Sequence, residues 1–289
     1  LPSPPFHPIP NTLNLRTATH TLTSNHPPNT LLRPKILFRS GALTHANWHT
    51  LHASLGITHI FDLRSQPEID KAGEPSCEKS AAGITRVWTP VFAATDYSPE
   101  RVAGRYGMYL SEGNGDGGFV SAYRDILDNA GPAFGRILGH VASLAKDPST
   151  TTETEPAGIL VHCTAGKDRT GIFYALLFDF LDVPRQQIAR EYHLSEQGLA
   201  PFREPGIERV RALPAFSEYV RRREEEEGGR EMDEAEQRRA AERMLGAREE
   251  SLMASLEMVD RVFGGAEAYF RGVCGVPREV LEGVRRVLV

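Results

Sequence analysis

The chain contains few cysteines, with 3 among its 289 residues: Cys77, Cys163 and Cys274. Three thiols so far apart in the sequence form neither a disulfide framework nor a zinc cluster. The sequence therefore excludes a disulfide-rich secreted scaffold and a zinc module, and it predicts a soluble cytoplasmic protein. At least one thiol then needs an explanation in the chemistry of reduced cysteine.

Long apolar runs and an excess of basic residues are missing as well. No run reaches the ~18–20 apolar residues of a membrane span, and the most apolar stretch, Ile172 to Val183, is interrupted by Asp179 and Asp182. The formal net charge is -5, so no overall basic field favours nucleic-acid binding. The amino end lacks the basic and apolar segments of an intact signal peptide, although the missing initial Met leaves a removed leader open. We therefore expect neither an integral membrane segment nor a nucleic-acid partner.

The first 34 residues differ in composition from the rest of the chain. They hold 8 prolines and, apart from His, only 2 charged residues, Arg16 and Arg33. This Pro-rich N-terminal arm, 1–34, is predicted to be extended and irregular, as either a disordered tail or an arm packed on the domain. Residues 35–289 are expected to form one α/β domain with insertions.

Short apolar, β-prone segments alternate with helical segments from Lys35 onward. The predicted strands are KILFRS (35–40), ITHIFDLRS (57–65), TRVWTPV (85–91) and GILVHC (158–163). Two amphipathic helical stretches with a break at Gly131-Pro132 precede the last strand, and the segment 170–183 after it is apolar nearly all round, as in a buried central helix. This alternation predicts an α/β fold in which helices flank both faces of a central, mostly parallel sheet.

The C-terminal region is predicted to be helical and to carry a charged excursion at 203–250. Between Arg221 and Glu250 there are 8 Arg and 11 acidic residues, with opposite charges three to four positions apart, as on a solvated helix. With few apolar anchors, this segment is either an exposed excursion or a mobile lid over the active site. An apolar stripe and a terminal helix after Pro277 then return to the core.

The most informative segment is the loop from Val161 to Gly171, which joins a predicted buried strand to the predicted buried helix. Its backbone amides converge at the carboxyl edge of the sheet, where the loop geometry and the helix dipole create an anion site. These amides stabilise the thiolate of Cys163 and make it a nucleophile. Arg169, six positions later, can grip two phosphoryl oxygens, and Gly166 lets the backbone turn without filling the pocket.

Three other interpretations of this loop fit less well. A nucleotide-binding P-loop requires GxxxxGK followed by Ser or Thr, whereas here position 161 is Val and Lys167 is followed by Asp168. A zinc site needs more ligands than His162 and Cys163, which point to opposite sides of a strand. A buried structural cysteine needs neither an Arg nor a Gly nor a helix start at these spacings.

The segment HCTAGKDRTG (162–171) matches the HCxxGxxR[ST]G signature of cysteine-dependent phosphatases. Together with FRSG (38–41) and the DLRS strand end (62–65), it resembles the tyrosine/serine protein phosphatase family over residues 35–289. The resemblance implies the cysteine-phosphatase fold with a helical C-terminal extension, no cofactor and no metal. The family's amino-terminal NFRD-type motif reads NLRT (14–17) here, with Thr17 where Asp is usual.

The resemblance also implies roles within the loop. Cys163 is the nucleophile, and Thr170 donates a hydrogen bond that helps to expel the thiolate. His162 holds Cys163 through a backbone contact, and Lys167 adds positive charge suited to substrates with several phosphates, such as phosphoinositides. The residues that bind the phosphate, with Arg169 as the clamp, are Thr164, Ala165, Gly166, Lys167, Asp168 and Arg169.

The general acid has several candidates, because a carboxylic acid must protonate the leaving group. Asp62 ends a buried strand at the sheet edge that carries the loop and matches the family's DLRS aspartate, so we expect it to be the acid. Asp168 within the loop is the second candidate. Two further candidates lie on Gly- or Ser-containing loops, Asp96 and Asp116. Arg64 and Glu68 are expected to form a structural ion pair that orients the strand end.

These features predict a metal-independent phosphatase that forms a phosphocysteine intermediate. The expected substrates are phosphotyrosine proteins, with phosphoserine and phosphothreonine proteins as further substrates and phosphoinositides as the alternative. Two interpretations from other classes are an inactive phosphatase fold that binds a phosphorylated ligand, and a sulfur transferase with the same loop geometry. Turnover of p-nitrophenyl phosphate tests the first, and an assay with thiosulfate and cyanide tests the second.

Overall fold

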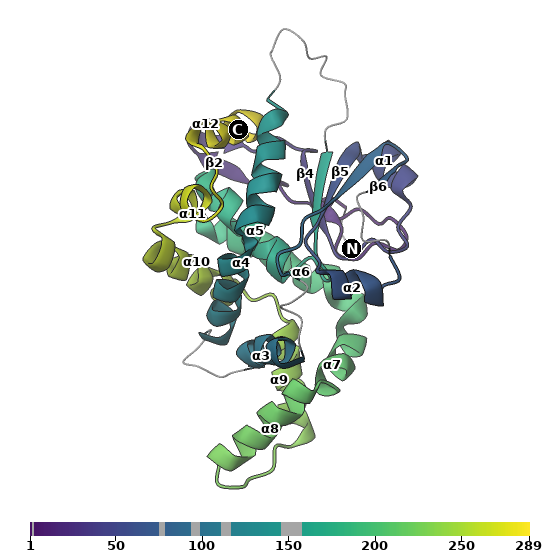
Figure 1. Ribbon diagram of the computed structural model, residues 1–289, viewed down its shortest axis with the longest axis vertical. Helices are drawn as coiled ribbons and strands as arrows, with labels where there is room; N and C mark the ends of the chain where they lie inside the picture. The colour runs from purple at the N-terminus through teal and green to yellow at the C-terminus, as the bar shows by residue number, and fades with distance from the viewer. Residues whose placement is uncertain (2, 75–78, 94–98, 111–116, 146–157) are drawn as a thin grey trace.

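A six-stranded sheet forms the centre of the computed structural model, which describes residues 1, 3–74, 79–93, 99–110, 117–145 and 158–289 (Figure 1). The four inner strands run parallel, and the two edge strands pair antiparallel with their neighbours. In sheet order the strands are β1 (Arg16–Thr17), β4 (Leu37–Ser40), β8 (Gly158–His162), β5 (Ile57–Asp62), β7 (Ile84–Trp88) and β6 (Lys79–Ala81). The predicted α/β fold with a mostly parallel sheet is confirmed.

Helices cover both faces of this sheet, because alternate side chains of its strands point to opposite faces. In β8, Ile159 and Val161 belong to the large core cluster, whereas Leu160 belongs to a smaller cluster with Leu51 of α1 (Trp48–Leu55). The larger face is covered by α4 (Gly117–Ser143), α5 (Asp168–Phe180), α6 (Arg185–Leu199), α10 (Glu249–Phe263), α11 (Ala266–Gly272) and α12 (Arg278–Leu288). Among the described residues, no helix has the length and apolar character to cross a membrane.

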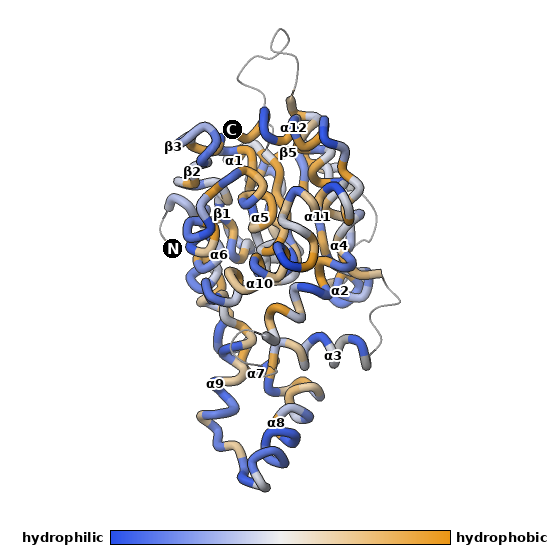
Figure 2. Tube along the Cα trace, turned by 90° about the vertical axis from the view of Figure 1, so that its left-hand side faces the viewer, coloured by the Kyte–Doolittle hydropathy of each residue, from blue (hydrophilic) through white to orange (hydrophobic). Residues whose placement is uncertain are grey.

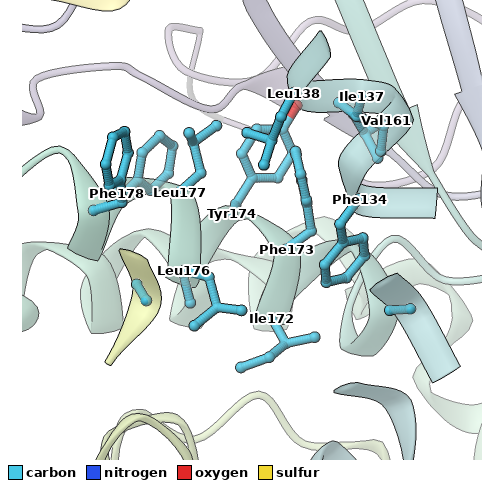
Figure 3. Close-up of a cluster of buried hydrophobic side chains, with 14 of the residues drawn as sticks. Phe134, Ile137, Leu138, Val161, Ile172, Phe173, Tyr174, Leu176, Leu177 and Phe178 are labelled. Atoms are coloured by element: carbon cyan, nitrogen blue, oxygen red, sulfur yellow. The ribbon is translucent and has the colours of Figure 1, made fainter. Parts of the chain in front are cut away.

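Helix α5 runs through the middle of the large core, and its apolar side chains are buried on all sides (Figure 3). Seven of its side chains are fully buried: Thr170, Ile172, Phe173, Tyr174, Leu176, Leu177 and Phe178. The ring of Phe173 meets the ring of Phe134 from α4 with centroids 5.0 Å apart. The predicted buried central helix is confirmed, and its fixed position sets the position of the loop that precedes it.

Helix α4 continues through Pro132, so the predicted break at Gly131-Pro132 is wrong. An internal proline costs a helix about 3 kcal/mol. The buried face of α4 runs across the proline, from Phe119 in the first half to Phe134 and Val141 in the second. Each buried ring of this kind contributes about 1.5–3 kcal/mol, so packing along the whole face outweighs the local penalty.

The N-terminal arm lies on the domain. Its strand β1 pairs with β4, and β2 (Thr23–Asn25) and β3 (Pro28–Leu31) form a separate hairpin. The backbone N–H of Asn25 donates to Asp182 O and that of Arg33 donates to Leu288 O. Five apolar side chains of the arm are at most 4% exposed: Phe6, Leu15, Ala18, Leu22 and Leu32.

The charged excursion consists of the turn η2 (Ala200–Phe202) and three helices, α7 (Arg203–Arg211), α8 (Pro214–Glu226) and α9 (Glu234–Leu245). With α3 (Pro99–Leu110) these helices form a unit, here called the helical cap, that extends beyond the carboxyl edge of the sheet (Figure 1). Much of α8 and α9, in the outer part of this unit, is coloured as hydrophilic in Figure 2.

The helical cap has an apolar core of its own. Each cap helix contributes one to three buried residues to it: Leu110, Ile207, Val210, Phe216, Tyr219, Ala240, Ala241 and Met244. The exposed charges form pairs such as Arg221 with Glu218 and Glu225, each at 2.5 Å. The expectation of few apolar anchors is therefore wrong, while a movement of the cap over the site stays a prediction.

Candidate active site

The loop 163–167 lies where three parallel strands end together. In the sheet register, His162 at the end of β8 is paired with Ser40 of β4 and with Asp62 of β5. Helix α5 begins at Asp168, so its first amides point back toward the loop. Gly166 has a φ of 66°, and a Cβ at this position would lie 2.1 Å from Ser40 O. Glycine is therefore the residue that lets the loop turn against β4.

Arg169 is held by Glu68 in a two-pronged ion pair. The distances are 2.7 Å from Nη1 to Oε2 and 2.6 Å from Nη2 to Oε1. Glu68 is itself fixed by a capping box at the start of α2 (Gln66–Lys71), where the N–H and the hydroxyl of Ser65 both donate to its Oε2 at 2.9 Å. Thr164 Oγ1 donates to the other oxygen. The plane of the guanidinium is thus fixed beside the loop.

The predicted ion pair between Arg64 and Glu68 is wrong. Arg64 instead donates from Nη1 to Oε1 of Glu74 at 2.9 Å and from Nη2 to Oδ2 of Asp62 at 2.8 Å. Glu68 instead forms its ion pair with Arg169. Both arginines lie beside the end of β5, and the chain order does not reveal which carboxylate meets which guanidinium.

Asp62 is fully buried and binds two guanidinium groups, those of Arg64 at 2.8 Å and Arg86 at 2.6 Å. Burial alone would raise the pKa of Asp62, but nearby His162, Arg64 and Arg86 together lower this pKa well below its usual value. A general acid must hold a proton near neutral pH and must reach the leaving group. In this structure Asp62 is a buried counter-ion of Arg64 and Arg86, which argues against its expected role as the acid; that role stays a prediction.

Asp168, the second candidate, lies in the first turn of α5 with its side chain one-quarter exposed. Its Oδ1 accepts a hydrogen bond from Tyr123 Oη at 3.2 Å, and Tyr123 Oη lies 2.6 Å from Tyr192 Oη. Helices α4 and α6 therefore orient this carboxylate. Half-buried Tyr109 of the cap belongs to the same surroundings, since burial and then the charge of Asp168 raise its pKa well above the usual value.

The Lys167 side chain is buried and bonds to backbone carbonyls near the end of α9. It is 4% exposed, and its Nζ donates to Met244 O at 2.9 Å and to Gly246 O at 3.0 Å. These bonds occupy the side chain and argue against the expected contact with substrates that carry several phosphates, which stays a prediction. Its ammonium group instead ties the loop to the junction between α9 and α10.

The remaining loop residues lie where the sequence places them, around the mouth and floor of the loop. Cys163 is 2% exposed, Thr164 is exposed and Ala165 is half-buried. His162 Nδ1 lies 3.1 Å from Cys163 O, which is the predicted backbone contact. Thr170 is fully buried, and its Oγ1 has no hydrogen-bond partner among the described residues. The two loop candidates for the acid lie outside the described residues, Asp96 and Asp116.

Sequence reasoning missed a buried polar layer beneath the loop. It consists of Asn14, Arg16, Arg39 and Glu191, each at most 7% exposed. Glu191 accepts hydrogen bonds from both arginines. The signal was partly visible, because Asn14 and Arg16 are the two residues that NLRT shares with the NFRD-type motif. Glu191 lies in an ordinary amphipathic helix, and nothing in its local sequence marks it.

Comparison with known proteins agrees with this geometry. Residues 7–289 match the profile of the tyrosine phosphatase family. The chain belongs to this family. It is therefore a phosphatase, as the loop sequence predicts.

Two curated relatives of this phosphatase also carry phosphatase names. The chain is 28% identical over 293 residues to the triple specificity protein phosphatase PtpB of Mycobacterium tuberculosis, an alignment that covers 97% of this chain and 98% of the relative. It is 41% identical over 69 residues to a tyrosine-protein phosphatase of Nostoc commune, which covers 24% of each. The family match begins before the NLRT segment and includes the whole helical cap.

Proposed function

We propose that this phosphatase hydrolyses phosphotyrosine in proteins, and also phosphoserine and phosphothreonine, through a phosphocysteine intermediate. The observation that carries the proposal is the position of Cys163 at the start of a loop of converging amides, opposite an Arg169 whose plane Glu68 fixes. Such a site matches the charge and the shape of a phosphoryl group. Cys163 and Cys274 are free thiols, which suits a reducing compartment such as the cytoplasm.

In the first step, the Cys163 thiolate attacks phosphorus, so that an S–P bond forms as the P–O bond to the leaving group breaks. Loop amides and Arg169 stabilise the negative charge on the three remaining oxygens. In the second step, water attacks phosphorus, the S–P bond breaks and the thiolate leaves. The unpartnered hydroxyl of Thr170 is available to donate a hydrogen bond to that thiolate.

Asp168 is the proposed general acid. Its carboxyl group lies in the first turn of α5, directly after the loop, is partly exposed and is oriented by Tyr123. In the first step it gives a proton to the leaving oxygen, and in the second step it takes one from the attacking water. Proton transfer of this kind contributes about 10²–10⁴-fold to the rate.

Protein substrates are favoured over phosphoinositides by one observation. The lysine that would meet additional phosphates is occupied by two backbone carbonyls, Met244 O and Gly246 O. The name of the mycobacterial relative includes triple specificity, which makes a third substrate class worth measuring alongside the two classes of phosphoprotein.

Quenched-flow trapping tests the mechanism. Wild-type protein mixed with a ³²P-labelled phosphotyrosine peptide and quenched in acid should carry label on Cys163, and Cys163→Ser should lose both label and turnover. Retained turnover in Cys163→Ser, or loss of wild-type turnover on addition of EDTA, would contradict the mechanism. Absence of any turnover of p-nitrophenyl phosphate would favour a phospho-ligand binding module.

A substrate panel tests the specificity. Phosphotyrosine peptides should give the highest kcat/KM, followed by phosphoserine and phosphothreonine peptides. A phosphoinositide turned over at higher kcat/KM than every peptide would refute the proposed preference while leaving the mechanism intact.

A further inference from the structure

The segment NLRT (14–17) plays no part in the chemistry proposed above, yet two of its side chains lie directly beneath the phosphate loop. Asn14 Nδ2 donates to Ala165 O at 3.2 Å and to Gly166 O at 3.3 Å. Arg16 Nη1 donates to Asn14 Oδ1 and so holds the amide in this orientation. Asn14 is 2% exposed and Arg16 is fully buried.

A second arginine grips the same part of the loop. Arg39 Nη2 donates to Gly166 O at 2.7 Å. Glu191 of α6 joins the two cations, with Oε1 at 2.8 Å from Arg16 Nε and Oε2 at 2.6 Å from Arg39 Nη1. Two buried guanidinium groups therefore share one carboxylate, which leaves one excess positive charge beneath the loop.

These contacts determine which way the loop amides point. In a trans peptide the C=O and the following N–H point in opposite directions. When Ala165 O and Gly166 O are drawn down onto Asn14 and Arg39, the N–H groups of Gly166 and Lys167 must point to the other side. That side is where a phosphoryl group on Cys163 would lie, and oriented backbone amides of this kind bind anions.

We propose that Asn14 is a positioning residue, which, supported by Arg16, Arg39 and Glu191, orients the loop amides for the phosphoryl group. This inference rests on the proposed function of the loop. Asn14 adopts a φ of 57°, a conformation that Asn tolerates better than most residues. Its side chain fits against Gly198 of α6, where a Cβ would lie 2.0 Å from Asn14 Oδ1. Any side chain at position 198 must therefore displace the amide.

The first test replaces the donor and keeps the shape. Asn14→Asp retains the acceptor for Arg16 but loses the N–H groups that hold the two carbonyls. The matched control is Asn11→Asp, because Asn11 has a φ of 58° and its Nδ2 also donates to a backbone carbonyl, that of His45 at 3.1 Å, which does not belong to the loop. We expect Asn14→Asp to raise the inhibition constants of orthovanadate and inorganic phosphate about tenfold or more, with a similar fall in kcat/KM. Asn11→Asp should stay within twofold of wild type.

The second test displaces Asn14 without a change of charge. Gly198→Ala in α6 should weaken inhibition by both oxyanions about tenfold, although Ala is the better helix former. Its control is Gly139→Ala in α4, where nothing lies within 4 Å of an added Cβ. The pH dependence of Cys163 alkylation by iodoacetamide gives an independent readout, because misoriented amides stabilise the thiolate less. Its midpoint should move to higher pH in both test variants and in neither control.

Oxyanion inhibition and alkylation midpoints that stay within wild-type error in folded Asn14→Asp and Gly198→Ala would overturn the proposal, even if both variants melt earlier. If Asn14→Asp does not fold, Gly198→Ala decides alone. Failure of the phosphocysteine mechanism would look different, since turnover would then survive Cys163→Ser whatever the effect at position 14.

Discussion

Replacing Asp62 and Asp168 separately by Asn distinguishes a structural carboxylate from a catalytic one. Asp62 accepts hydrogen bonds from Arg64 N and Nε at 3.0 Å and from Arg86 Nη2 at 2.6 Å. Asp62→Asn removes the negative charge that balances these two guanidinium groups. One of the two carboxylate oxygens becomes an NH₂ group, which cannot accept their hydrogen bonds. Asp168→Asn removes a partly exposed carboxyl group that touches Tyr123.

The two variants should differ in kind. Breaking a buried ion pair by removing one partner costs about 3–5 kcal/mol, because the other charge is left buried. At roughly 2 °C per kcal/mol for a domain of this size, Asp62→Asn should lower the Tm by about 6–10 °C. Below its Tm it should retain kcat within roughly threefold for every leaving group. Asp168→Asn should leave the Tm nearly unchanged and slow alkyl phosphates by about 10²–10⁴-fold, while aryl phosphates of acidic phenols change little.

The pH dependence provides a second readout for Asp62. The pKa of this carboxyl is lowered in the fold, so it stabilises the fold at every pH above its unfolded value near 3.8 and loses this contribution as the pH falls below that value. The Tm difference between wild type and Asp62→Asn should therefore be constant between about pH 5 and 8 and should shrink below about pH 4.

The assay is kcat over a series of aryl and alkyl phosphates, combined with thermal unfolding of each variant. A steep dependence on leaving-group pKa in Asp62→Asn and not in Asp168→Asn would refute the reasoning from burial. If neither variant shows the dependence, the acid lies among the residues that the structure does not describe, and Asp96 and Asp116 are the next to replace.

Three further results are expected. Phe216→Ala removes a ring from the core of the helical cap; if the cap covers the site, this variant should speed the inactivation of Cys163 by peroxide, and dithiothreitol should restore activity. Cys274→Ser should leave the rate of peroxide inactivation unchanged, because burial raises the pKa of the Cys274 thiol to about 12 and keeps it protonated. Burial and a neighbouring histidine lower the pKa of His140 to about 4, so the unfolded chain binds a proton at higher pH than the fold does. The Tm of wild type should therefore fall as the pH is lowered from 6.5 to 4, and the Tm of His140→Leu should fall less. Parallel plots of Tm against pH for the two proteins would contradict this. Lys167→Met should speed backbone amide exchange at 244–247 and leave the inhibition constant of phosphate within twofold of wild type. A tenfold rise in that inhibition constant would instead indicate that Lys167 binds the phosphate.

The sequence is sufficient for the loop because all its parts are local. Cys163, Gly166 and Arg169 lie within seven positions, and the strand before them and the helix after them have unmistakable apolar patterns. Parallel strands then bring the ends of β4 and β5 to the same edge. The position of Asp62 at that edge follows from the same rule, and the structure places it there.

The direction of each side chain at that edge does not follow from the sequence. The charge environment of Asp62 depends on Arg86. This arginine comes from the next strand in the sheet, β7, and the register between the two strands brings it to the carboxylate. A carboxylate at a strand end is equally compatible with an open pocket and with a buried ion pair. Sequence position alone therefore predicts where a titratable group lies and leaves its protonation state undetermined.

The apolar core of the helical cap could not be predicted from its sequence, in which charged residues dominate. Among the residues that the structure describes, its buried residues are spread over four helices, α3, α7, α8 and α9, with no more than three from each. None of these described stretches carries an apolar stripe wide enough to predict burial. The core exists only when all four helices meet. Because Lys167 bonds to the chain where α9 ends, a cap that shifts as one unit must also pull on the phosphate loop. Opening of the cap would then break the Lys167 contacts as well as expose apolar area, so this lysine links the cap to the loop, as does Tyr109 of the cap beside Asp168.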